Sequence, residues 1–196
     1  MNYPAIMPAV PAIVRSPLRA LVALLMAVFL IVPAFADDAT DKLLDELFVQ
    51  LHDAPDEATA RAISDRIWTI WVNPTDPDLK GRMMDVMEAR SMRSIETTIA
   101  LLDQLVLDYP DYAEGWNQRA TMHFMRGDYE ASIADCARVL ELEPRHFGAL
   151  AGRAVIYLQQ GKRSLALRDM KAALSLHPFL NERHLFPELE QEVTRT

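Results

Sequence analysis

The sequence predicts an all-α fold made of helical hairpins that stack on one another. Three prolines, Pro110, Pro144 and Pro178, are evenly spaced along the chain, and each closes a stretch with helical periodicity. Two glycines, Gly127 and Gly161, are separated by the same step. A fixed period, here about 34 residues, is typical of a chain that repeats one supersecondary unit. A single unit cannot bury its apolar face alone, so neighbouring units must stack to form the core.

The stretch 113–146 shows the unit most clearly. Asp111 and Glu114 have the spacing of a capping box, which would satisfy free backbone donors at the start of a first helix. Gly127 suits the left-handed residue that ends this helix, and Asp128 is expected to cap the second helix. The proline near the end of the unit stops the second helix because it has no backbone N–H.

Two further stretches follow the same plan. Residues 147–180 repeat it, with Gly161 at the turn. Residues 79–112 fit it more loosely, because Arg93 stands where the other units have glycine. The sequence therefore predicts three hairpins in series.

The chain outside the three units is expected to form a divergent repeat or an N-terminal cap before them and a C-terminal cap after them. Residues 37–74 carry two apolar stripes around a proline-containing loop, which predicts a divergent N-terminal helical hairpin. Residues 181–196 predict a short cap helix from about Glu182, with Asn181 as its N-cap residue. Terminal units of a stack need a polar outer face, and three acidic residues would provide it: Glu188, Glu190 and Glu192.

The unit resembles the tetratricopeptide repeat (TPR) family, whose motif runs Trp-x-x-Leu-Gly-x-x-Tyr, then Ala-x-x-x-Phe, then Pro. The positions that carry the resemblance are Trp116, Ala120, Gly127, Tyr129, Pro144, Ala154, Tyr157, Gly161, Ala166 and Pro178. Arg119 and Arg153 replace the usual leucine, and Cys136 and Met170 replace the second aromatic. The resemblance covers residues 79–180 and implies a non-catalytic scaffold or adaptor that binds proteins.

The resemblance also implies where a partner would bind, because the first helices of TPR units line a concave surface. The partner-binding residues expected there are Met83, Met87, Asn117, Gln118, Thr121 and Ala151. They carry no positive charge, so the sequence predicts no clamp for a partner's terminal carboxylate. Flexible methionines would suit apolar segments, although methionines also fill gaps in cores.

Two charge pairs recur at equivalent positions of successive units. Arg119 precedes Asp135 by the same interval that separates Arg153 from Asp169. One interpretation is an acid–base pair for catalysis, and the other is an ion pair that braces the two helices of each hairpin. Their repetition favours the structural interpretation, since a catalytic site is normally single.

The sequence shows no motif for catalysis, a cofactor or a metal. Nucleophile elbows, phosphate-binding glycine loops and Cys-x-x-Cys pairs are absent, and no two histidines have the spacing of a helical metal pair. Cys136 is the single cysteine and is expected to be a buried thiol. We therefore predict a protein that is not an enzyme; an envelope enzyme or a metal chaperone is the alternative.

Residues 1–36 have the pattern of a secretory signal peptide. Two basic residues precede an apolar run over 20–32, and a small-x-small cleavage site follows at 34–36. Export to the periplasm is expected, with Met1 or Met7 as the start. The alternative is an uncleaved signal that anchors the chain in the inner membrane, which would be its only contact with a membrane.

The chain has a formal net charge of −8, which disfavours binding to nucleic acid. A protein partner is therefore expected. The alternative is self-association into a structural envelope protein, which Trp68 and Trp71 would support if they were exposed.

Overall fold

The computed structural model describes residues 37–189, and within this range the chain is helical and contains no strand. The helices, in order, are α2 (Asp37–His52), α3 (Glu57–Val72), α4 (Pro77–Ser91), α5 (Ile95–Asp108), α6 (Ala113–Arg126), α7 (Tyr129–Leu142), α8 (Phe147–Gln159), α9 (Arg163–Leu176) and the 3-10 helix η1 (Asn181–Leu185). The predicted all-α fold of stacked hairpins is confirmed. The export signal predicted over 1–36 lies outside the described residues, as do Glu190 and Glu192.

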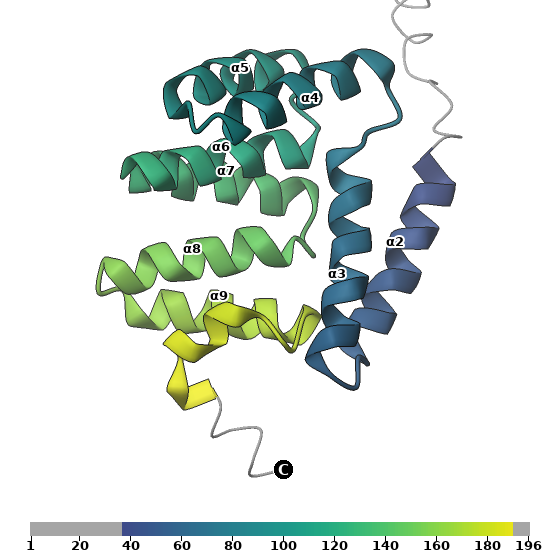
Figure 1. Cartoon of the computed structure of the whole chain (residues 1–196). Coiled ribbons are helices and arrows are strands. Elements are labelled where there is room, and N and C mark those ends of the chain that lie inside the picture. Colours follow the sequence, from purple (N-terminus) through teal and green to yellow (C-terminus); the bar gives the residue numbers. More distant parts are fainter. Residues whose placement is uncertain (1–36, 190–196) are drawn as a thin grey trace, which may run out of the picture. The chain divides into compact units, whose positions relative to one another are not determined.

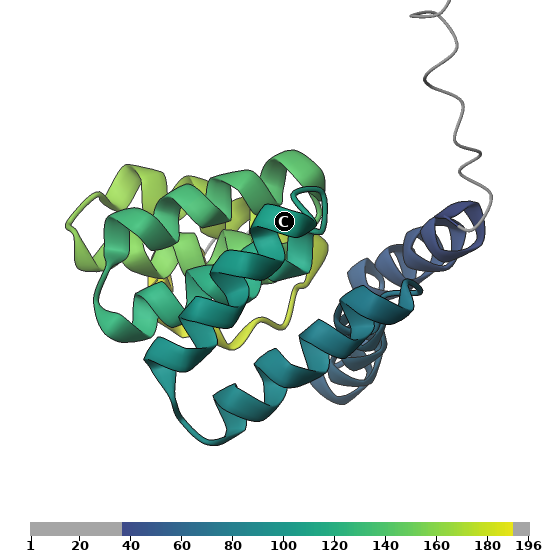
Figure 2. The same cartoon turned by 90° about the horizontal axis from the view of Figure 1, so that it is seen from above.

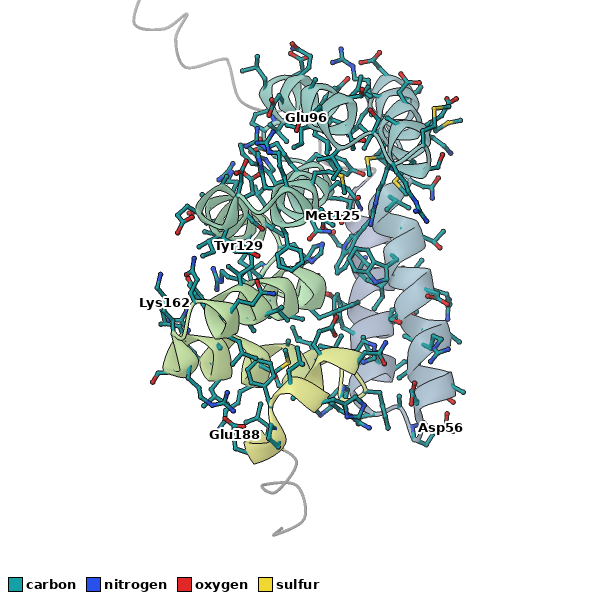
Figure 3. All side chains as sticks on the ribbon, turned by 60° about the vertical axis from the view of Figure 1, so that its left-hand side comes forward. Asp56, Glu96, Met125, Tyr129, Lys162 and Glu188 are labelled. Carbon is teal, nitrogen blue, oxygen red and sulfur yellow. The ribbon has the colours of Figure 1, made fainter. Side chains whose placement is uncertain are left out.

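Helices α4 to α9 form three antiparallel hairpins that stack one above another (Figure 1). The turns within the hairpins lie on the side of the stack opposite α2 and α3. Figure 3 marks these turns through the labelled Glu96, Tyr129 and Lys162 near the starts of the second helices. Neighbouring hairpins share apolar contacts, so the fixed step of the sequence becomes the repeat of the stack.

Each hairpin turn contains a residue with left-handed backbone. Gly127 has φ 89° and Gly161 has φ 70°, as their places in the pattern predict. Arg93 adopts the same conformation, with φ 58°, although it is not glycine. The backbone geometry of the first turn therefore matches that of the other two, although a side chain in this region costs about 1–2 kcal/mol.

The caps predicted for three helices are not formed. Tyr112 precedes α6 without a side-chain cap, and the buried Glu114 carboxylate turns toward His146 instead of the helix start. Asp128 makes no cap for α7, because its carboxylate pairs with Arg126. η1 likewise has no side-chain cap, since the residue at its N-cap position is Leu180 and not Asn181.

The N-terminal hairpin crosses the stack instead of continuing it. Helices α2 and α3 run beside the ends of the repeat helices (Figures 1 and 2). Their apolar faces share one core with α8 and α9, in which Leu51 and Ala154 are fully buried. The Arg145 guanidinium also donates to the Asp45 carboxylate at 2.5 Å, a contact between segments far apart in sequence. The hairpin therefore joins the start of the described chain to its last repeat.

The two tryptophans of α3 are part of this contact. Trp71 stacks on the His146 ring with centroids 4.2 Å apart, and Trp68 meets Phe147 edge to face at 5.6 Å. The Tyr112 hydroxyl donates to the Trp71 carbonyl at 2.6 Å. Trp71 is 9% exposed, so it does not meet the condition under which it would support self-association. Trp68 is half-buried against the same ring cluster.

The predicted ion pairs and the buried thiol are present. The Arg119 guanidinium donates two hydrogen bonds of 2.8 Å to Asp135, and Arg153 donates one of 2.6 Å to Asp169. Each pair joins the two helices of one hairpin, as the structural interpretation requires. Cys136 is 3% exposed, and burial raises the pKa of its thiol to about 12.

Candidate partner-binding site

Four of the six residues predicted to bind a partner are buried. Met83 is 1% exposed because it packs in the core shared by α4, α5 and α6. Ala151 is 2% exposed, and Asn117 and Gln118 are 7% and 5% exposed. These burials are corrections to the expected concave surface, since they leave little side-chain area for a partner. Met87, at 39%, and the half-buried Thr121 remain accessible.

Asn117 and Gln118 are held in a buried network around Glu114. Both amides donate to the Glu114 carboxylate, Asn117 at 3.2 Å. Arg90 of α4 donates to the Gln118 side-chain oxygen at 2.5 Å, which ties the first repeat to this network. The amides of these two residues thus join adjacent helices and are engaged in the protein's own structure.

His146 completes the network from the start of α8. Its Nδ1 accepts from the Ala149 amide at 3.1 Å, so the ring proton is on Nε2 and is donated to Glu114, also at 3.1 Å. Both side chains are about 1% exposed. A buried carboxylate is tolerated here because several donors surround it. No sequence signal indicates this pair, because its members belong to different units and are far apart along the chain.

An open hollow lies between the first helices α6 and α8 and is walled by η1. Its volume is about 330 Å³. We refer to it as the inner hollow, and its lining residues are Asn117, Ala120, Thr121, Phe124, Ser132, Cys136, Gly148, Gly152, Val155, Ile156, Glu182 and Leu185. The lining is mostly apolar and contains no lysine or arginine, so it offers no positive charge to pair with a carboxylate.

A second hollow of about 270 Å³ continues along α8 toward α3. We refer to it as the outer hollow, and its lining residues are Glu57, Arg61, Ser64, Trp68, Phe147, Gly148, Ala151, Gly152, His177, Phe179, Leu180, Asn181 and Glu182. The two hollows share Gly148, Gly152 and Glu182. Together they form one groove along the exposed side of α8.

Small residues of α8 create the depth of this groove. A Cβ added at Gly152 would meet no atom within 4 Å, so the missing side chain leaves open space there. A Cβ at Gly148 would instead lie 2.9 Å from the Trp68 ring, which shows how closely α3 approaches α8. The groove therefore depends on glycine at both positions, for different reasons.

The wall formed by η1 was not predicted from the sequence. Leu185 and Glu182 follow the last repeat, where we expected a cap helix, and they instead border the inner hollow. Phe186 is fully buried in the core shared with α2 and α3, and it holds this segment in place. An aromatic residue such as Phe186, placed after the proline that closes the last repeat, Pro178, is the sequence signal that could have indicated a packed segment.

Two further features bear on function. No group of three or more histidine, cysteine, aspartate or glutamate side chains in the described range is placed to hold a metal ion. None of the helices between residues 37 and 189 has the length and apolar character needed to cross a membrane.

Comparison with known proteins gives three similarities. The tetratricopeptide repeat family model matches residues 113–146, the unit that the sequence shows most clearly. A TPR repeat-containing protein of Rhizobium etli is 34% identical over 143 residues, which cover 73% of this chain and 70% of that protein. The crystal structure of MamA is 14% identical, with a TM-score of 0.48, and covers 81% of this chain and 89% of that chain.

Proposed function

We propose that this chain, which belongs to the tetratricopeptide repeat family, binds a segment of a partner protein in the groove along α8. Family membership supports protein binding in general. The observation that carries the specific proposal is the inner hollow, because it combines an accessible apolar lining with the polar edge of Thr121. Concave sites with apolar walls and few polar groups are typical places for ligands to bind.

The chain then acts as a scaffold or adaptor without a catalytic step. The signal pattern over residues 1–36 supports a place for it in the cell envelope. An envelope protein or an exported protein would then be the partner. Self-association lacks its main support, since Trp71 is buried and Trp68 packs against Phe147.

Photo-crosslinking in living cells tests the proposal. A photo-reactive residue at Thr121 lies in the inner hollow, whereas the same residue at Leu107, which is 72% exposed on α5, serves as the control. We expect an adduct with a distinct envelope protein from Thr121 and not from Leu107. Equal adducts from both positions, or adducts only between copies of this chain, would contradict the proposed binding site.

A further inference from the structure

We infer that the groove selects a partner segment that carries an apolar anchor close to a basic side chain. The anchor enters the inner hollow, and the cation pairs with Glu182 where the two hollows meet. This inference rests on the proposed function and names the chemistry of the partner.

The shape and lining of the inner hollow favour an apolar anchor. Its volume of about 330 Å³ lies at the lower end of the range for ligand pockets, about 300–1,000 Å³. Phe124, Val155 and Leu185 provide apolar walls around it. The Ser132 hydroxyl, which also lines the hollow, already donates to the Ala120 carbonyl at 2.8 Å. An apolar side chain would therefore bury surface here without displacing this internal hydrogen bond.

The charges of the groove favour a cation beside that anchor. Three residues that line the two hollows carry full charges, namely Glu57, Arg61 and Glu182. Arg61 donates to Glu57 at 2.8 Å, so these two form a pair. Within residues 39–189, the Glu182 carboxylate makes no hydrogen bond or ion pair. The groove therefore keeps one uncompensated negative charge at its centre.

This charge decides between classes of partner. A lysine or arginine near the anchor gains an ion pair with Glu182, while an acidic residue or a free C-terminus is repelled. The net charge of −8 on the whole chain acts in the same direction at longer range. A second copy of this acidic chain is a poorer match on the same ground.

The test uses the full chain and a panel of synthetic peptides. Each fluorescent peptide has blocked ends, one leucine in an alanine–glutamine background, and one lysine, glutamate or glutamine placed one to four positions away. Fluorescence anisotropy gives the affinity of each. We expect the best lysine peptides to bind about tenfold more tightly than their glutamate counterparts, and the difference to shrink as salt is raised.

Two variants connect binding to the groove. Gly152→Leu fills the inner hollow, and we expect at least tenfold weaker binding. The same change at Gly81, which also faces open space but lies on α4 away from the groove, is the matched control and should bind as the wild type does. Glu182→Lys should reverse the preference from lysine to glutamate peptides. A melting curve of each variant verifies that it folds.

The outcomes separate this inference from the proposed function. If peptides bind but neither Gly152→Leu nor Glu182→Lys changes their affinity, the inference is overturned while peptide binding stands. If no peptide binds although Thr121 crosslinks a partner protein, the inference is again overturned and the function survives. If no peptide binds and Thr121 crosslinks no partner protein, both the inference and the proposed function are contradicted. Sedimentation that shows a dimer, lost in Gly152→Leu, would assign the groove to a second copy and overturn the inference.

Discussion

Single residues in this protein take their chemistry from burial and from neighbours in other repeats. Glu114 and His146 would be ordinary polar residues on a surface, but the fold places them side by side and removes them from water. Trp71 then covers the His146 ring, so α3, α6 and α8 meet at one point. The same principle acts on Cys136, whose thiol is held in its neutral form by burial.

The burial of Cys136 leads to a prediction about how the free energy of unfolding depends on pH. The thiol pKa is about 12 in the folded chain, against a reference value of 9.0, so the folded state keeps a proton that the unfolded state releases. The stabilisation of the folded state by the buried, protonated thiol is fully present below pH 9 and is lost as the pH rises toward 12. Between pH 9 and 10.5 we expect the free energy of unfolding to fall by about 1 kcal/mol per pH unit from this group.

Urea unfolding at several pH values measures this effect. The variant Cys136→Ala loses packing at neutral pH, but its stability should fall less steeply above pH 9 than that of the wild type. Tyr112, whose pKa burial also raises, acts equally in both proteins and so cancels in the comparison. Parallel pH profiles for the two proteins would show that the thiol is not desolvated.

At the scale of the elements, the backbone pattern was more predictable than the side-chain caps. Proline and glycine act locally, so their regular spacing predicted the hairpins, and Gly127 and Gly161 have the left-handed geometry expected of them. The capping box at Glu114 was wrong because a long-range contact with His146 competes with the local one. Such competition is invisible in a single sequence, since it depends on how distant units pack.

The turn at Arg93, between α4 and α5, leads to a prediction about the stability of the protein. Arg93 has φ 58°, which is strained for a residue with a side chain, so Arg93→Gly should raise the free energy of unfolding by about 0.5–1 kcal/mol. The reverse change at the equivalent turn, Gly127→Ala, should lower it by about 1 kcal/mol. Chemical denaturation measures both. A loss of stability in Arg93→Gly would mean that the arginine side chain supports the turn.

At the scale of the whole described chain, the N-terminal hairpin is the feature that the repeat pattern could not place. The apolar stripes of residues 37–74 predicted helices, and α2 and α3 occupy most of that range. Their packing against α8 and α9 could not be predicted, because the stripes do not indicate which apolar surface they cover. The partner-binding residues were affected similarly. Their positions in the repeat predicted that they lie on a surface, but the network around Glu114 buries Asn117 and Gln118.

The contact between this hairpin and the last repeat yields a prediction for the whole chain. Trp71→Ala removes the ring that packs on both Phe48 and His146, and it should lower the free energy of unfolding by about 3–5 kcal/mol. Leu107→Ala, at a position that is 72% exposed, should change it by less than about 0.5 kcal/mol. Urea titrations followed by circular dichroism compare the two. A small loss in Trp71→Ala would show that the hairpin adds little to the stack.

The most direct test of binding in the groove is the yield of the Thr121 photo-adduct in living cells, measured in three backgrounds. These are the wild type, Gly152→Leu, which fills the inner hollow, and Gly81→Leu, which makes the same change away from it. We predict one partner adduct in the wild type and in Gly81→Leu, and its loss in Gly152→Leu. An adduct of equal yield in all three would contradict binding in the groove along α8.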